Sequence, residues 1–288
     1  MKRDILTASG HPLAEWIRGE RLPFLFCSGC SIGSSVACLT RAFSRAVTNP
    51  DNLVVVSGIG CTGRASGYLR AGTFHTTHGR TIPFATGAKF ANPDLDVVIF
   101  TGDGDMAAIG GNHLIHAARR NMGITVICVN NHIYGMTGGQ MGPTTPQGDV
   151  KTQSTPYGNI EPTFNLVSLV AAAGATYVAR WTARHQIRME DSIVSAIQHA
   201  RQYGMAFIEV VSVCPTYFGK YNKLGEASDM LKTFDSITTV VEPLTVSPHD
   251  AVSDLSSIVC GEFVRRESTE FTRAYQEMTD VIQKESGA

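Results

Sequence analysis

The sequence has no run of apolar residues long enough to cross a membrane, and its first residues are polar rather than a hydrophobic signal. It also lacks an excess of charge, because 24 Lys and Arg residues nearly balance 25 Asp and Glu residues. We therefore expect neither nucleic acid nor a membrane as a partner. The chain contains no internal repeat and no low-complexity tract, and 288 residues are enough for one large α/β core.

Cysteine is present in an odd number, seven, which is not the pattern of a secreted disulfide framework. We therefore expect a protein of the reducing cytoplasm, where paired cysteines usually serve metal or redox chemistry. Cys27 and Cys30 form a Cys-x-x-Cys pair just before a predicted helix start. Taken alone, the pair fits zinc, a thioredoxin-like dithiol or an iron–sulfur cluster.

Short apolar segments alternate with helical segments over the first 220 residues. The predicted strands are 53–57, 96–100, 125–129, 175–178 and 206–211, and the predicted helices are 109–121, 163–173 and 189–202. This alternation predicts an α/β fold with a parallel sheet flanked by helices.

Two further segments are expected to have special roles. Residues 135–157 form a long connection rich in Gly, Pro, Thr and Gln, which is typical of a functional loop. The pattern weakens after residue 220, so we expect a domain over 1–220 and a C-terminal extension over 221–288. The extension would end in an amphipathic helix over 257–283 and would pack on the domain or on a partner subunit.

The turn after the predicted strand 96–100 carries the strongest functional signal. Gly102 and Gly104 allow backbone N–H groups to approach an anion, and a helix that starts nearby adds its positive end. Asp103 between them would bind a hard cation such as Mg²⁺, with the Asn131 side chain and the Ile133 carbonyl as further oxygen ligands. A lone Gly-Asp-Gly also fits an ordinary turn, but the strands on both sides and the Asn residues that follow predict a metal-bound diphosphate.

Two more cysteines also follow predicted strands. Cys61 lies in a glycine-rich turn after the strand 53–57, and Cys214 comes after the strand 206–211. Because ligands gather at the carboxyl ends of parallel strands, we expect these loops and the Gly-Asp-Gly turn to face one crevice. Four thiolates beside such a site would suit a [4Fe–4S] cluster.

In order and spacing, these motifs resemble those of the β subunits of the 2-oxoacid:ferredoxin oxidoreductases, most closely of the 2-oxoglutarate type. The resemblance covers about residues 20–220 and includes the segments 75–80 and 134–140 and the Cys-Pro at 214–215. It implies the diphosphate-type fold of thiamine diphosphate enzymes. It also implies that Cys27, Cys30, Cys61 and Cys214 ligate one [4Fe–4S] cluster, and that Asp103, Asn131 and the Ile133 carbonyl hold Mg²⁺.

The resemblance further implies which residues line thiamine diphosphate: Ile59, Gly60, Cys61, Thr62, Gly104, Asp105, Gly135 and Met136. Cys38, Cys128 and Cys260 match no ligand position, and we expect them to be small buried hydrophobes.

The implied activity is the coenzyme A-dependent oxidative decarboxylation of a 2-oxoacid, with electrons passed through the cluster to ferredoxin, or the reverse carboxylation. We expect 2-oxoglutarate as substrate, and pyruvate or another 2-oxoacid is the alternative. The chain contains one thiamine-binding half only, so the resemblance implies an α subunit, in an (αβ)₂ assembly with the cofactor at the interface.

Three residues are candidates for contacts with substrate or cofactor. Arg64 could pair with the remote carboxylate of a dicarboxylate, although a surface salt bridge is the other interpretation. His75 and His78 could bind substrate or cofactor oxygens, or could be structural.

Two other functions stay open at this point. A zinc-stabilised binding module would explain the cysteines but would leave Asp103 and Asn131 without a role. A thiamine-dependent decarboxylase or ligase without iron would share the diphosphate motif, but it would not need four cysteines at strand ends.

Overall fold

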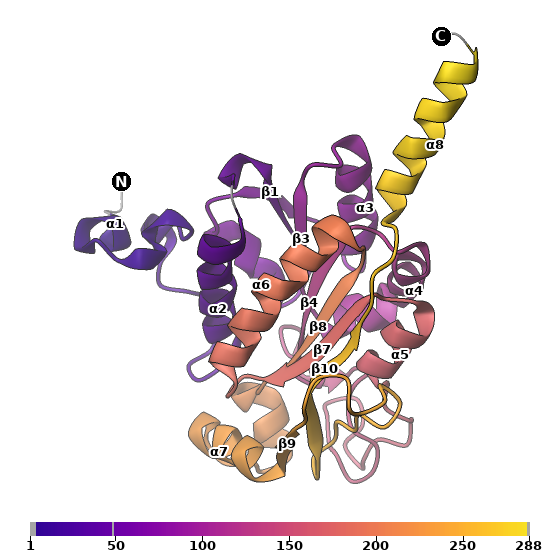
Figure 1. Cartoon of the computed structure of the whole chain (residues 1–288). Helices are drawn as coiled ribbons and strands as arrows, with labels where there is room; N and C mark the ends of the chain where they lie inside the picture. The colour runs from indigo at the N-terminus through magenta and orange to yellow at the C-terminus, as the bar shows by residue number, and fades with distance from the viewer. Residues whose placement is uncertain (1–3, 48, 287–288) are drawn as a thin grey trace.

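A computed structural model describes residues 4–47 and 49–286 and contains an eight-stranded sheet in the order β2-β1-β3-β4-β8-β7-β10-β9 (Figure 1). The strands are β1 (Leu53–Ser57), β2 (Gly72–His75), β3 (Asp96–Gly102), β4 (Ile124–Asn130), β7 (Tyr177–Thr182), β8 (Ala206–Val211), β9 (Thr238–Val240) and β10 (Ile258–Arg265). All neighbouring pairs are parallel except β7 and β10. The expected α/β fold with a largely parallel, helix-flanked sheet is confirmed.

Helices cover both faces of the sheet (Figure 1). One face carries α2 (Ile32–Ala46) and α6 (Gln186–Gln202), and the other carries α3 (Thr81–Ala91), α4 (Gly111–Arg120) and α5 (Leu166–Ala173). The remaining helices are α1 (Ile5–Ser9), α7 (Ala227–Ile237) and α8 (Phe271–Ser286).

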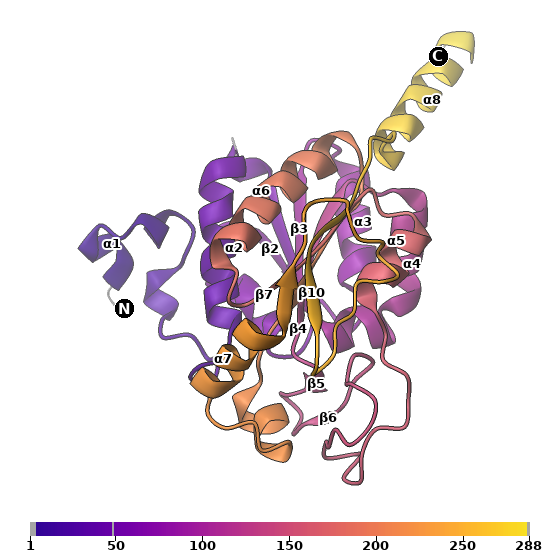
Figure 2. The same ribbon diagram turned by 60° about the horizontal axis from the view of Figure 1, so that its bottom comes forward.

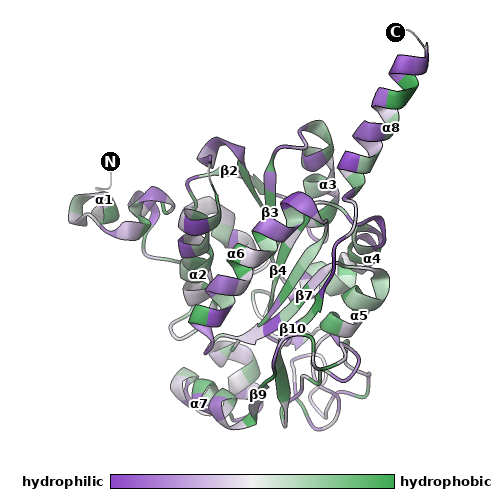
Figure 3. Cartoon of the chain, in the orientation of Figure 1, coloured by the Kyte–Doolittle hydropathy of each residue, from purple (hydrophilic) through white to green (hydrophobic). Residues whose placement is uncertain are grey.

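The central strand β4 explains why the strand predictions succeed. All seven of its residues are buried. Ile127 and Val129 pack in the core under α2 and α6, whereas Val126 and Cys128 pack in the core on the other face. A parallel strand covered on both sides is largely apolar, so most of the β4 sequence is apolar, in agreement with the green centre of Figure 3.

The expectation of one helix over 257–283 is wrong in its first half. Residues 258–265 form β10, which pairs antiparallel with β7 and contains a bulge between Glu262 and Val264. Helix α8 begins only at Phe271 and extends away from the sheet (Figures 1 and 3). The residues after 220 thus contribute two strands, β9 and β10, to the sheet, together with α7 and the protruding helix α8. In the described part of the chain, no helix has the length and apolarity needed to span a bilayer.

The long loop after β4 is ordered around a small hairpin, β5 (Ile133–Tyr134) and β6 (Gln140–Met141). Figure 2 shows this hairpin at the end of the sheet where β4 finishes. The loop therefore lies at the edge where the predicted site should be.

Candidate active site

A cavity opens where β1, β3 and β4 end. It is lined by all eight residues expected to contact thiamine diphosphate, and also by Asp103, Asn131 and Ile133. Of the three candidate contact residues, His78 is in this lining. The structure therefore brings together residues that are up to 77 positions apart in the sequence, from Ile59 to Met136.

Asp103 is buried at the base of this cavity, with 3% of its surface exposed. Its Oδ2 accepts a hydrogen bond of 2.5 Å from the Thr144 hydroxyl. Burial raises the pKa of Asp103 to about 6, and hydrogen bonds from Thr144 and from backbone N–H groups offset part of this rise. A cation beside the carboxylate would stabilise its ionised form, so the residue fits a metal ligand.

A strained turn orients the other two oxygen donors. His132 lies between them with φ of 64°, in the left-handed region that few residues other than glycine adopt. Its N–H donates to Asn130 Oδ1 at 3.1 Å, and its Nδ1 donates to the Thr144 carbonyl at 2.9 Å. Burial lowers the pKa of His132, which favours the neutral ring. The turn places the side chain of Asn131 and residue Ile133 on the same cavity wall.

Asp105 is also buried, but its carboxylate is already used by the protein. Oδ1 accepts the N–H groups of Gly79 at 2.8 Å and Ile59 at 3.3 Å, and Oδ2 accepts the Thr101 hydroxyl at 2.8 Å. His78 Nδ1 lies 2.7 Å from Oδ1 but is not aligned for a hydrogen bond. Asp105 therefore ties the loops after β1 and β2 to β3, a bracing role that the sequence did not reveal.

Gly104 is required by a close approach between two loops. A Cβ on this residue would lie 2.2 Å from Cε1 of the Tyr134 ring, and the Tyr134 hydroxyl donates to the Gly104 carbonyl at 3.3 Å. The absence of a side chain lets Tyr134 pack directly over the turn that follows β3.

A second cavity adjoins the first and is lined by Cys27, Cys30, Cys61 and Cys214. Burial raises the pKa of the Cys30 thiol to about 12 and of the Cys61 thiol to about 11, and the neighbouring cysteines raise both further. The four predicted ligands thus share one partly buried site. A soft metal centre would favour their thiolate form, so the donor set fits an iron–sulfur cluster.

Among residues 4–47 and 49–286, no three His, Cys, Asp or Glu side chains are placed to hold one metal ion. Cys38, Cys128 and Cys260 are fully buried in the apolar core, as expected of small hydrophobes.

The other two candidate contact residues lie away from the first cavity. Arg64 is exposed and lines the cysteine cavity, and its side chain makes no hydrogen bond or ion pair within the described residues. The surface salt bridge considered for it is therefore not formed here. His75 is exposed, lines neither cavity, and donates through Nδ1 to the Gly63 carbonyl at 2.9 Å.

Comparison with known proteins agrees with these features. A family model for the C-terminal TPP-binding domain of thiamine pyrophosphate enzymes matches residues 36–210. The match includes the Gly-Asp-Gly turn and Cys61, and it leaves out Cys27, Cys30 and Cys214.

The chain is also similar to whole subunits. It is 47% identical to the 2-oxoglutarate synthase subunit KorB of Methanocaldococcus jannaschii over 275 residues, covering 96% of this chain and 100% of that protein. It is 52% identical to the 2-oxoglutarate synthase subunit KorB of Archaeoglobus fulgidus over 204 residues, which cover 71% of this chain and 74% of that protein. The structure is similar to that of a solved 2-oxoglutarate:ferredoxin oxidoreductase from Magnetococcus marinus with 2-oxoglutarate, coenzyme A and succinyl-CoA bound. The TM-score is 0.81 and the sequence identity is 28%, and the match covers 96% of this chain and 91% of that one.

The raised pKa of Asp103 predicts a pH-dependent stability of the metal-free chain. The folded pKa of about 6 lies above the ordinary 3.8, so the bound proton stabilises the fold fully below pH 4 and this stabilisation is lost as the pH rises through 6. The neutral variant Asp103→Asn should therefore be more stable than the parent at pH 8, on the order of 1–3 kcal/mol, and similar at pH 4. Urea denaturation with a chelator present measures this, and a pH-independent difference would contradict it.

Proposed function

Because this chain belongs to the thiamine pyrophosphate enzymes, and within them to the β subunits of the 2-oxoacid:ferredoxin oxidoreductases, we propose that it oxidises 2-oxoglutarate together with an α subunit. The carboxylate next to the keto group of the substrate leaves as carbon dioxide. The remaining acyl group is transferred to coenzyme A to give succinyl-CoA. Two electrons leave through a [4Fe–4S] cluster to ferredoxin, one at a time. The same site can run the reverse carboxylation.

The observation that carries the proposal is the junction of the two cavities. They share Cys61, Asn131, Gly135 and Met136. These four residues form a common wall between the cavity that contains Asp103 and the cavity lined by the cysteines. A site for a metal-bound diphosphate beside a site for an iron–sulfur cluster suits a reaction that removes two electrons from its substrate. A thiamine enzyme without iron would have no use for the second cavity.

Residues of this chain would hold and orient the groups. Asp103, Asn131 and the Ile133 carbonyl would bind Mg²⁺, because all three line one cavity and offer hard oxygen ligands. Thiamine diphosphate, when bound, supplies the carbon nucleophile and the electron sink for 2-oxoacid decarboxylation. The side chains of Ile59 and Met136 give the cavity apolar walls, which exclude water from the reacting centre.

The assembly is part of the proposal. Ile59 and Met136 line the cavity but are 38% and 47% exposed, as expected of residues that an α subunit covers. We place both cofactor sites in residues 1–220. The extension 221–288 contributes β9 and β10 to the sheet and presents α8 to a partner in an (αβ)₂ complex. None of the seven cysteines forms a disulfide, which suits the cytoplasm that we propose as the location.

The direct test is the activity of the complex formed with its α subunit. Purified complex should form an acyl-CoA from 2-oxoglutarate and coenzyme A while reducing a one-electron acceptor, and it should turn over pyruvate more slowly. Reaction only in the absence of coenzyme A, or a rate that is the same with iron-free protein, would contradict the proposal.

The cluster assignment predicts a clear division among the cysteines. Ser at any one of Cys27, Cys30, Cys61 or Cys214 should lower the iron content, because a serine oxygen replaces a thiolate poorly. Ser at Cys38, Cys128 or Cys260 should leave the iron in place, because these thiols lie in the apolar core. Iron analysis and low-temperature electron paramagnetic resonance of the reduced complex measure both sets. Loss of iron in the second set would disprove the ligand assignment.

Arg64 is proposed to select the dicarboxylate substrate, because its guanidinium is exposed and has no ion-pair partner in the described residues. Arg64→Met should lower kcat/KM for 2-oxoglutarate by on the order of 2–5 kcal/mol in transition-state free energy, as for losing one side of a desolvated charge pair. Turnover of pyruvate, which has no second carboxylate, should change little or improve. Steady-state kinetics with both substrates measures the ratio, and equal losses would assign Arg64 to the support of the Cys61 loop.

A further inference from the structure

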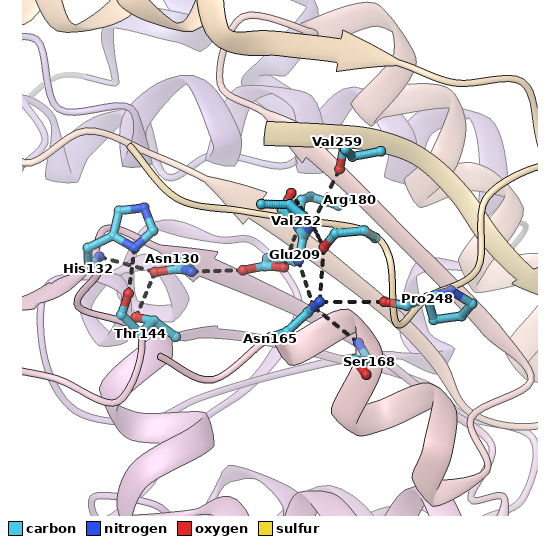
Figure 4. Close-up of polar contacts among 11 residues, drawn as sticks. Asn130, His132, Thr144, Asn165, Ser168, Arg180, Glu209, Pro248, Val252 and Val259 are labelled. Atoms are coloured by element: carbon cyan, nitrogen blue, oxygen red, sulfur yellow. Dashed lines mark hydrogen bonds and ion pairs between the residues drawn. The ribbon is translucent and has the colours of Figure 1, made fainter. Parts of the chain in front are cut away.

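A continuous line of hydrogen-bonded polar side chains runs through the apolar core from Arg180 to Thr144 (Figure 4). It begins at Arg180 on β7, the largest side chain of the core that is fully buried. Arg180 Nε donates to Glu209 Oε2 on β8 at 2.7 Å, and the two residues are partners in the register of these adjacent strands. Glu209 is 1% exposed, so this ion pair is shielded from water.

The other carboxylate oxygen of Glu209 fixes the orientation of Asn130, the last residue of β4. Asn130 Nδ2 donates to Glu209 Oε1 at 2.7 Å. Because an ionised carboxylate only accepts hydrogen bonds, the amide must turn its NH₂ group toward Glu209 and its oxygen the other way. Asn130 Oδ1 then accepts the His132 N–H at 3.1 Å and lies 2.9 Å from the Thr144 hydroxyl (Figure 4).

Thr144 joins this line to Asp103 through its hydroxyl, which lies 2.5 Å from Asp103 Oδ2. The hydroxyl carries one hydrogen, and an ionised Asp103 is a stronger acceptor than the Asn130 amide. When Asp103 is ionised and takes the Thr144 hydrogen, Asn130 Oδ1 still accepts the hydrogen bond from the His132 N–H. The Thr144 carbonyl also accepts from His132 Nδ1 at 2.9 Å, so Thr144 holds both Asp103 and the left-handed turn of His132.

Stability alone does not account for a buried ion pair at this place. The desolvation of two charges offsets much of their attraction, and apolar residues of similar volume often serve the fold equally well. The Arg180 guanidinium is instead fully engaged: Nη1 donates to the Ala251 carbonyl at 2.8 Å and Nη2 to Asn165 Oδ1 at 3.0 Å (Figure 4). A network whose members are all hydrogen-bonded holds its side chains in one arrangement.

We propose that Thr144 and Asn130 are positioning residues for the magnesium–diphosphate site, held in place by the buried Arg180–Glu209 pair. Thr144 orients the Asp103 carboxylate, and Asn130 holds the His132 turn that presents Asn131 and Ile133. Neither positioning residue needs to touch the cofactor. The inference rests on the proposed function, since it assumes that Asp103 and Asn131 bind the metal.

The test removes the Thr144 hydroxyl in the complex with the α subunit. Thr144→Val keeps the shape of the side chain, and Thr144→Ser keeps the hydroxyl. Equilibrium dialysis against thiamine diphosphate over a series of Mg²⁺ concentrations gives the Mg²⁺ concentration at half-maximal cofactor retention. Thr144→Val should raise it by about 10-fold to 100-fold, which is the usual effect of losing a hydrogen-bond partner of a metal ligand. Thr144→Ser should restore most of the affinity.

Thr152→Val is the matched control. Thr152 lies in the same loop and is 2% exposed. Its hydroxyl forms a hydrogen bond with the Thr155 hydroxyl and not with Asp103 or Asn130. Thermal unfolding of the metal-free complexes should show similar losses for Thr144→Val and Thr152→Val, whereas the Mg²⁺ requirement should change for Thr144→Val only. If Thr144→Val does not assemble, Thr144→Ala and Thr144→Ser form the pair that differs by the hydroxyl.

The outcomes separate this inference from the proposed function. A parent complex that retains no thiamine diphosphate at any Mg²⁺ concentration overturns the metal assignment itself. A parent that binds normally, with Thr144→Val equal to it or with Thr152→Val impaired as strongly, overturns only the positioning role. Thr144→Ser failing as badly as Thr144→Val would also overturn it, because the hydroxyl would then not be what matters.

Discussion

The strands β1, β3, β4 and β8 run in the same direction, so the loops that follow them must open at one edge of the sheet. Cys61, Asp103, Asn131 and Cys214 each follow one of these strands. The strand register then sets how far along the sheet these residues lie, since Gly102 on β3 is paired with Val129 on β4, just before Asp103 and Asn131. Parallel pairing thus brings together residues 153 positions apart, from Cys61 to Cys214, at one edge.

Hydrogen bonding then decides which acidic residue is available to a ligand. Asp103 and Asp105 follow the same strand and are both almost fully buried. The Asp105 carboxylate is occupied by two backbone N–H groups and the Thr101 hydroxyl, so binding a metal there would break bonds that hold three segments together. Asp103 has a single side-chain donor, Thr144, and faces the cavity. The surroundings of the two carboxylates therefore support the proposal that Asp103, and not Asp105, binds the metal.

Most of the fold and the main site could be predicted because their signals are local. Strand β8 was predicted with its observed bounds, since a parallel strand covered on both faces is largely apolar, and in β8 only Glu209 departs from this pattern. Strand β10 was mistaken for helix because its identity depends on pairing with β7, some 80 residues earlier in the chain. The roles of Asn130 and Thr144 were missed for the same reason: Asn130 is oriented by Glu209, 79 residues away, and Thr144 contacts Asp103 across 41 residues. Metal binding at Asp103 and Asn131 stays a prediction, as do the contacts proposed for Arg64 and His78.

The glycine that begins the loop after β5 lies in the wall between the two cavities. A Cβ at Gly135 would lie 3.5 Å from Cys214 Sγ and 3.7 Å from Cys61 Sγ, which are ordinary contacts, but a longer side chain built on it would compete with these sulfurs for space. Gly135 lines both cavities, and its backbone is therefore the thinnest partition the chain can place between them. An electron donor bound in one cavity and an acceptor bound in the other would be separated by little more than this peptide backbone. The lack of a side chain at Gly135 thus contributes to the close approach of the two cavities, together with Cys61, Asn131 and Met136, which also line both.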